Sequence, residues 1–239
     1  MKTIVCWKWE PFKGYRSKFT AEHVDIFARM IRRAYAGPLE VVCITDDPTG
    51  ITEVDRIIPL WDDFKDMPSP HDRGVRANPS CYRRLKMFAP DAAEWLGERI
   101  ISIDLDVVVT GDLTPLFDRE EDFIAWGDTN PTTYYNGGFI SFKAGSRPQL
   151  WTEFCADPAA AVRKAQLARQ WGSDQGWIGG CLGPNEARFK RADGVYSYRN
   201  EVRPSGRVPL DARLVFFHGE HDPWGREPQT LPWVRENYR

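Results

Sequence analysis

The chain has 239 residues, of which 42% are hydrophobic and 28% are charged, and its formal net charge at pH 7 is −2. These values are typical of a soluble globular protein, and they argue against a general attraction to nucleic acid or to an anionic membrane, although a local basic patch would still permit one. The five cysteines are scattered without a CxxC pair, which argues against a disulfide framework and against a zinc ribbon.

The N-terminal part of the chain follows a strand–loop–helix–strand order. Residues 3–9 form a short apolar run that predicts a first strand, and residues 10–18 form a loop. Apolar residues then recur at helical spacing over residues 20–36, where Thr20 can cap the helix and Gly37-Pro38 ends it. A second strand follows at residues 40–45. This order indicates a parallel α/β sheet.

The rest of the chain alternates between helical and strand patterns. Residues 55–72 read as irregular because they contain three prolines, whereas Tyr82, Leu85 and Phe88 define one face of a helix over residues 80–89. In the short helix that follows, Asp91 and Glu94 have the spacing of a capping box. The remaining predictions are a strand at 99–109, strands at 122–126, 138–142 and 214–217, and a helical region at 148–182 that breaks near Trp171.

No internal repeat or linker interrupts this pattern, so we expect one α/β domain over residues 1–239. No apolar run approaches the length of a membrane span. The N-terminus meets the charged Lys8 too early for a signal peptide, and we therefore expect a cytoplasmic protein. The ten tryptophans serve mainly as core residues in this interpretation, with some available to stack on a sugar or a base.

Two carboxylates, Asp104 and Asp106, lie at the end of the strand predicted over residues 99–109. Because side chains alternate along a strand, both carboxylates are expected to point to the same side. Two neighbouring carboxylates repel each other unless a cation compensates them, and oxygen ligands suit magnesium or manganese. A D-x-D somewhere in a chain of this length also arises by chance, although one embedded in apolar strand residues is rarer.

His218 directly follows the strand predicted at residues 214–217 and precedes Gly219, a place from which it can reach the ligand-binding edge of an α/β sheet. Both a structural histidine and a third metal ligand fit this position, and the imidazole nitrogen would favour manganese. Asn136 and Gly137 precede another strand, where they are either a simple turn or a close approach to a ligand.

Asp174 and Gln175 either begin a helix or bind sugar hydroxyls, and the basic cluster around Arg84 is either a solvated face or a phosphate site. Together and in this order, these segments resemble the GT-A glycosyltransferases, most closely those related to family eight and their bacterial and phage relatives. The resemblance extends from Ile4 to Trp224. It implies a GT-A domain with a mainly parallel mixed sheet flanked by helices.

The resemblance also assigns roles to individual residues. It implies metal ligation of Mn²⁺ or Mg²⁺ by Asp104, Asp106 and His218. Three residues are implied to be catalytic: Asp174 and Gln175 beside the reacting carbon, and Arg84, which assists the departure of the diphosphate. It further implies that the donor nucleotide and sugar are bound by a larger set, namely Lys8, Tyr15, Arg84, Asp104, Asn136, Gly137, Arg199 and Gly219. In one respect the chain departs from this family, since Asp222 stands where relatives have a lysine that neutralises the diphosphate. Arg199 and Arg226 are the two candidates to replace it.

The function implied is a metal-dependent, retaining glycosyltransferase, expected to be a hexosyltransferase that uses a UDP-sugar donor. Two alternatives stay open: a non-catalytic nucleotide-sugar-binding protein on a decayed transferase scaffold, and a sugar-1-phosphate nucleotidyltransferase. The second usually has a glycine-rich loop directly after its first strand, and this chain does not. A glycan, a protein side chain, a small molecule and a modified nucleobase all fit as acceptor, and the sequence indicates no oligomeric state.

Overall fold

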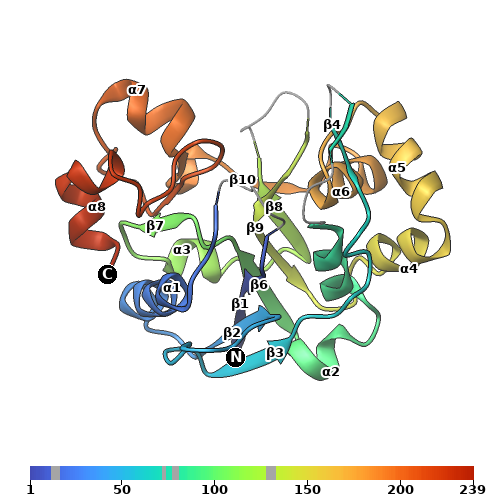
Figure 1. Ribbon diagram of the computed structural model, residues 1–239, viewed down its shortest axis with the longest axis horizontal. Helices are drawn as coiled ribbons and strands as arrows, with labels where there is room; N and C mark the ends of the chain where they lie inside the picture. The colour runs from blue at the N-terminus through green and yellow to red at the C-terminus, as the bar shows by residue number, and fades with distance from the viewer. Residues whose placement is uncertain (12–16, 72–73, 77–80, 128–132) are drawn as a thin grey trace.

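The computed structural model describes residues 1–11, 17–71, 74–76, 81–127 and 133–239 (Figure 1). A seven-stranded sheet forms the centre of the fold, with the strand order β10-β8-β9-β6-β1-β2-β3. β1 is parallel to β2 and β6, β2 to β3, and β8 to β10, whereas β9 runs antiparallel to both β6 and β8. The predicted mainly parallel mixed sheet is therefore confirmed. Its strands are β1 (Lys2–Lys8), β2 (Leu39–Thr45), β3 (Arg56–Pro59), β6 (Arg99–Ile103), β8 (Phe123–Trp126), β9 (Asn136–Lys143) and β10 (Ala187–Phe189).

Two smaller sheets accompany the central one. The first has the order β11-β12-β7 and comprises β7 (Val107–Val109), β11 (Val195–Ser197) and β12 (Leu214–Phe216). The second is an antiparallel pair of β4 (Ser69–His71) and β5 (Gly74–Arg76).

Helices cover the central sheet on both sides. In Figure 1, α1, α3, α7 and α8 lie on one side together with β7, whereas α4, α5 and α6 lie on the other. The α-helices are α1 (Ala21–Ala34), α2 (Ala92–Leu96), α3 (Thr114–Phe117), α4 (Gln149–Ala156), α5 (Pro158–Leu167), α6 (Asp174–Leu182), α7 (Arg203–Ser205) and α8 (Pro232–Asn237). Short 3₁₀ segments are η1 (Cys81–Phe88), η2 (Arg191–Asp193) and η4 (Pro228–Thr230), and η3 (Tyr198–Val202) is a π-helix.

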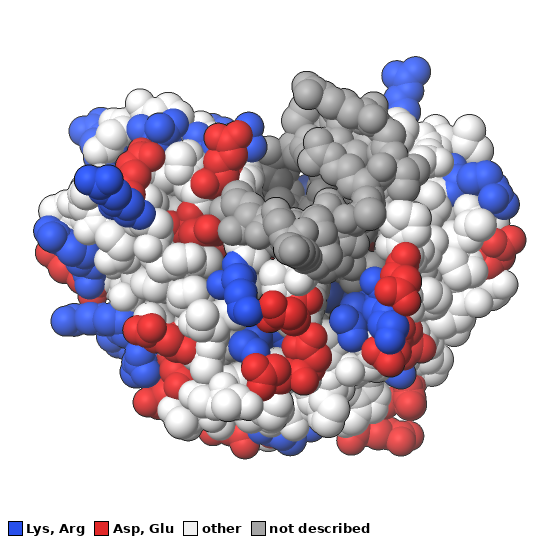
Figure 2. Space-filling view, viewed as in Figure 1, with Lys and Arg blue, Asp and Glu red and all other residues white. Residues whose placement is uncertain are grey.

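The central sheet separates two hydrophobic cores, because side chains along its strands point alternately to its two faces. Ile4 and Cys6 of β1 pack into the core beneath α1 and the three-stranded sheet, while Val5 and Trp7 pack into the core beneath η1, α4 and α6. Since both faces of β1 are buried, its sequence is a continuous apolar run rather than an alternating one. Among the described residues, no helix is long and apolar enough to cross a membrane. Figure 2 shows acidic and basic side chains interspersed over the described part of one face, in keeping with the small net charge.

Three expectations about local structure were wrong. The single strand predicted over residues 99–109 is two strands in different sheets, because the chain leaves the central sheet after Ile103 and joins the smaller one at Val107. The region 55–72 is not wholly irregular, since β3 extends the sheet beside β2 as far as Pro59 and β4 begins at Ser69. Asp91 stands at the N-cap of α2, but its side chain makes no capping hydrogen bond.

The helix predicted over residues 80–89 is present as the 3₁₀ helix η1. Tyr82, Leu85 and Phe88 are all buried, as expected. Their spacing of three residues matches the three-residue turn of a 3₁₀ helix better than the 3.6-residue turn of an α-helix. The buried stripe of η1 faces α4 and α6, and this packing fixes the helix that carries Arg84.

Candidate active site

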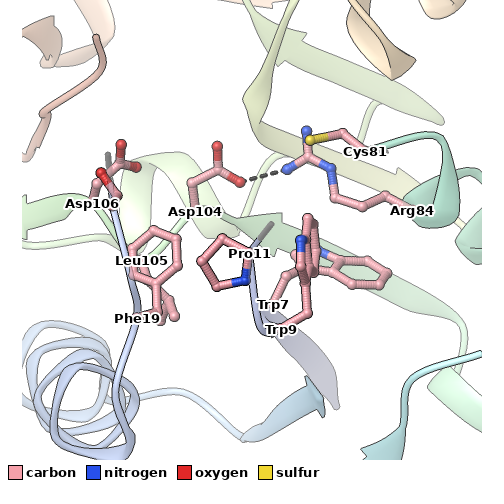
Figure 3. Close-up of a pocket in the computed structure, with 10 residues that line it drawn as sticks. Trp7, Trp9, Pro11, Phe19, Cys81, Arg84, Asp104, Leu105 and Asp106 are labelled. Atoms are coloured by element: carbon pink, nitrogen blue, oxygen red, sulfur yellow. Dashed lines mark hydrogen bonds and ion pairs between the residues drawn. The ribbon is translucent and has the colours of Figure 1, made fainter. Parts of the chain in front are cut away.

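A cavity of about 140 Å³ lies where β1 and β6 end (Figure 3). Ligands bind at the carboxyl ends of strands in open α/β sheets, so this position is the expected one. One wall of the cavity is apolar and largely aromatic, and the other carries charge. The apolar wall is formed by Trp7, Trp9, Pro11, Phe19 and Leu105, and the polar lining by Ser17, Cys81, Arg84, Asp104 and Asp106.

Asp104 and Asp106 lie in the short segment that connects the two sheets. The backbone N–H of Asp104 donates to the Gly138 carbonyl at 2.9 Å, while the Asp106 carbonyl accepts from the N–H of Phe217 at 2.7 Å. Leu105 between them is buried. In Figure 3 the two carboxylates point the same way and Leu105 points away toward Phe19. The prediction that both aspartates face one side is therefore confirmed, although the segment is not a strand.

Arg84 joins the two acidic motifs that the sequence singled out. Its Nη1 lies 2.5 Å from Asp104 Oδ1, and its Nε and Nη2 lie 2.7 and 2.6 Å from Asp174 Oδ2. Burial alone would lower the pKa of Arg84, but Asp174 and Asp104 raise it well above its ordinary value. Desolvation by the surrounding protein raises the pKa of Asp104, and Arg84 opposes this shift. The guanidinium is thus a permanent cation between two carboxylates.

Two glycines let the start of β9 approach this ion-pair network. A Cβ atom on Gly137 would lie 2.6 Å from Nη2 of Arg84, and one on Gly138 would lie 3.2 Å from Oδ2 of Asp104. The Gly137 N–H also donates to Oε1 of Gln175 at 3.4 Å. Gly137 and Gln175 are 38 residues apart in the sequence. The pairs Asn136-Gly137 and Asp174-Gln175 therefore meet at Arg84.

His218 follows β12, one residue beyond the bond between Phe217 and Asp106. Its Nε2 lies 2.7 Å from Ser197 Oγ. Burial lowers the pKa of His218, and the charge of Arg199 lowers it further, so the imidazole is neutral at pH 7. A neutral imidazole is the form that binds a metal ion.

Two carboxylates and one neutral imidazole are a suitable donor set for manganese. Within the ranges that the structure describes, however, no three His, Cys, Asp or Glu side chains form a cluster ready to hold a metal ion. The donor chemistry of Asp104, Asp106 and His218 therefore fits the metal, while Asp104 as it stands is paired with Arg84.

Other predicted residues lie farther from this network. The Nζ of Lys8 donates to the Asp47 carbonyl at 2.7 Å, at the end of β2, and Lys8 does not line the cavity. Tyr15 lies outside the described residues. The Asp222 carboxylate accepts from Ser17 Oγ at 3.0 Å, and Arg226 is exposed.

The aromatic wall is the part of the site that sequence reasoning missed. Trp7, Trp9 and Phe19 belong to the first strand and its loop, and the tryptophans were expected to be mainly core residues. The sequence did contain a signal for this wall: Trp7 and Trp9 stand at alternate positions where the first strand ends. Trp7 is buried and donates from Nε1 to Ser102 Oγ at 2.9 Å, whereas Trp9 is only partly buried.

Solved structures of sugar transferases share this fold. The galactosyltransferase LgtC, crystallised with donor and acceptor sugar analogues, matches with a TM-score of 0.63 at 15% identity, over 98% of this chain and 93% of LgtC. The glycosyltransferase GlyE of Streptococcus pneumoniae TIGR4, in its apo form, matches with a TM-score of 0.58 at 12% identity, and the matched region spans 62% of GlyE. No protein-family profile and no curated protein matches the sequence. These likenesses confirm that the chain resembles the GT-A glycosyltransferases related to family eight and has their fold.

Proposed function

We propose that this protein is a metal-dependent glycosyltransferase that transfers a sugar, with retention of configuration, from a nucleotide diphosphate to an acceptor. The observation that carries the proposal is the bridge made by Arg84 between Asp104 and Asp174, in the polar lining of a cavity with an aromatic wall. Like the resemblance in the sequence, the shared fold with LgtC and GlyE supports a transferase of sugars rather than a nucleotidyltransferase.

The lining of the cavity divides in a way that suits a nucleotide sugar. Trp9 and Phe19 offer aromatic faces for a nucleobase, and a UDP-sugar is the donor that we propose by the resemblance. Asp104, Asp106 and Arg84 line the polar side, where phosphate and sugar hydroxyls need charged and hydrogen-bonding partners.

Asp104, Asp106 and His218 are the residues that would hold a divalent ion, with Mn²⁺ favoured over Mg²⁺ by the imidazole nitrogen. The bound ion would stabilise the negative charge that develops on the leaving diphosphate, which is Lewis-acid chemistry. Arg84, held between Asp104 and Asp174, would contact the donor sugar and phosphates from the polar side of the cavity, and its permanent charge would assist the same departure.

The surroundings of Asp174 argue against a covalent intermediate. Its side chain is 3% exposed. Oδ2 accepts a hydrogen bond from Arg84 Nε at 2.7 Å and forms an ion pair with Arg84 Nη2 at 2.6 Å, and Oδ1 accepts a hydrogen bond from Ser173 Oγ at 3.1 Å. A carboxylate held in this way is a weak nucleophile, and the amide of Gln175 is weaker still. We therefore favour attack by the acceptor hydroxyl on the same face from which the diphosphate leaves. The bond from the anomeric carbon to the phosphate oxygen breaks, the bond to the acceptor oxygen forms, and the hydroxyl proton passes to the departing diphosphate.

The test is a panel of nucleotide sugars incubated with the protein, with Mn²⁺ or with excess chelator, while donor hydrolysis and transfer are followed by NMR. We expect turnover of at least one donor with Mn²⁺, none in chelator, and an α-linked product from an α-linked donor. Full activity in chelator would contradict the metal dependence, and a β-linked product would contradict retention. Binding of a donor without turnover on any acceptor would favour the non-catalytic alternative, whose main support is Asp222.

A further inference from the structure

Arg199 lies next to the proposed metal ligand His218 because two of its neighbours are anchored there. Ser197 Oγ lies 2.7 Å from His218 Nε2. The Tyr198 ring is buried and stacks on Phe217, with ring centroids 4.2 Å apart and an interplanar angle of 14°. The π-helix η3 is therefore fixed against the end of β12 at the two residues that precede Arg199.

The Arg199 side chain packs over the backbone of Gly219. A Cβ atom on Gly219 would lie 2.8 Å from Arg199 Nη1, and Gly219 has a φ of +84°, which a residue with a side chain rarely adopts. Glycine at position 219 thus leaves room for a guanidinium group directly beside His218. Because of this packing the charge of Arg199 is held near the site, although the residue as a whole is exposed.

Arg199 differs from its arginine neighbours in how its charge is used. Arg191 forms an ion pair with Glu201, and Arg203 forms one with Glu227 at 2.8 Å. Within the described part of the chain, Arg199 has no ion pair and no side-chain hydrogen bond. A cation that is positioned by packing and has no carboxylate partner there is available to a bound anion.

The charges around the cavity show why such a cation is needed. Arg84 is the one cation of the cavity lining within the described ranges, and its hydrogen bonds go to Asp104 and Asp174. Asp106 adds a further carboxylate to the lining, and Asp222, held by Ser17, adds another beside it. A donor diphosphate would bring more negative charge into surroundings that are already acidic. A single divalent ion would not balance that total.

We propose that Arg199 binds the diphosphate of the donor and supplies the cation that Asp222 cannot supply. This inference rests on the proposed function, since it deepens the donor site of the same transferase. The guanidinium of Arg199 would bind two phosphate oxygens at once from its place beside Gly219 and His218. Arg226, the other candidate from the sequence, follows Asp222 on an exposed turn and has no comparable anchor in the described contacts.

The experiment is calorimetric titration of the protein with UDP and, separately, with uridine, both in the presence of Mn²⁺. Charge-assisted hydrogen bonds contribute about 1.5–3 kcal/mol, so Arg199→Ala is expected to weaken UDP binding by roughly 10- to 100-fold. Uridine binding should be unchanged, because uridine lacks the diphosphate. Arg199→Lys should retain part of the UDP affinity, and raised salt should weaken UDP binding more in the wild type than in Arg199→Ala.

Arg203→Ala is the matched control, since Arg203 lies four residues further along and its charge is paired with Glu227. This variant should bind UDP as the wild type does. Unchanged UDP affinity in Arg199→Ala, an equal loss in Arg203→Ala, or a loss confined to Arg226→Ala would overturn the assignment while leaving the proposed function intact. If the wild type binds neither UDP nor any other nucleoside diphosphate, the proposed function fails, and this inference fails with it.

Discussion

Replacing Arg84 by methionine should destabilise the fold as well as the site. The Arg84 side chain is 7% exposed, and that of Asp174, its main partner, is 3% exposed. Methionine fills a similar volume, so the principal loss is the charge, and Asp174 is then left buried beside Asp104 without a cation. Removal of one partner from a buried ion pair costs about 3–5 kcal/mol. For a protein of this size, about 3 kcal/mol corresponds to a fall in Tm of roughly 6–12 °C.

The assay is urea unfolding of the wild type and of Arg84→Met at pH 8 and at pH 5. Burial raises the pKa of Asp104 and Arg84 opposes that shift, so without Arg84 this carboxyl takes up a proton more readily and the destabilisation should be smaller at pH 5. The double variant Arg84→Met/Asp174→Asn should be more stable than Arg84→Met alone, because the amide carries no charge. Arg83→Met is the control. Arg83 is also buried, but it donates from Nε to the Trp61 carbonyl at 3.0 Å, and its ion-pair partner Asp62, 3.8 Å away, is exposed and stays solvated without it, so the destabilisation should depend little on pH.

Two results would refute this reasoning. One is a free energy of unfolding of Arg84→Met within about 1 kcal/mol of the wild-type value at pH 8, which would mean that the buried ion pairs contribute little to stability. The other is a destabilisation equal at both pH values and unrelieved by Asp174→Asn, which would assign the loss to packing rather than to charge.

Three further variants probe the site and the scaffold. Gly137→Ala places a Cβ atom 2.6 Å from Nη2 of Arg84, and overpacking of this kind costs about 1–3 kcal/mol; we expect lower stability by thermal melting and a lower kcat/KM, and a neutral result would contradict the close approach. Asp106→Ala should abolish the rise in Tm that Mn²⁺ with UDP produces in the wild type, and a retained rise would exclude Asp106 as a ligand. Asp25→Ala should lose about 2–3 kcal/mol at pH 7 by urea unfolding, because Asp25 accepts hydrogen bonds from Thr52 and Glu53. Burial raises the pKa of Asp25, but these bonds lower it more, to below its ordinary value of 3.8. The contribution of Asp25 to the free energy of unfolding is therefore full above pH 3.8 and is lost as the pH falls through the lower pKa of the folded state. A destabilisation of the same size at pH 3 and pH 7 would contradict this account.

The central sheet could be predicted from the sequence where burial is continuous. β1 and β2 are uninterrupted apolar runs because they are covered on both faces, and such runs are visible in a sequence. β3 was missed because it lies at the edge of the sheet, where Arg56 and Ile58 are half-buried and alternate with exposed residues. The division of residues 99–109 into two strands could not be predicted from the local sequence. Asp104 and Asp106 flank Leu105, which is as buried as the strands on either side, so the apolar pattern continues across the break.

The site was predictable as a set of motifs but not as a network. The sequence indicated Arg84, Asp104 and Asp174 separately, each with a plausible structural alternative. Their association depends on contacts between η1, the β6–β7 connection and the start of α6, and separations of 20 and 90 residues leave no periodic signal. The position of Arg199 beside His218 was even harder to predict from the sequence, because it depends on a π-helix and on the backbone of Gly219.

The two aspartates of the cavity are hydrogen-bonded to different sheets, so the boundary between the two sheets passes through the site. Asp104 is held to the central sheet through the Gly138 carbonyl, and Asp106 is held to the smaller sheet through the Phe217 N–H. The distance between the carboxylates therefore depends on how the smaller sheet sits against the larger one. A ligand bound by both carboxylates would therefore link the two sheets, and it would restrict the movement of β7, β11 and β12, none of which lines the described part of the cavity.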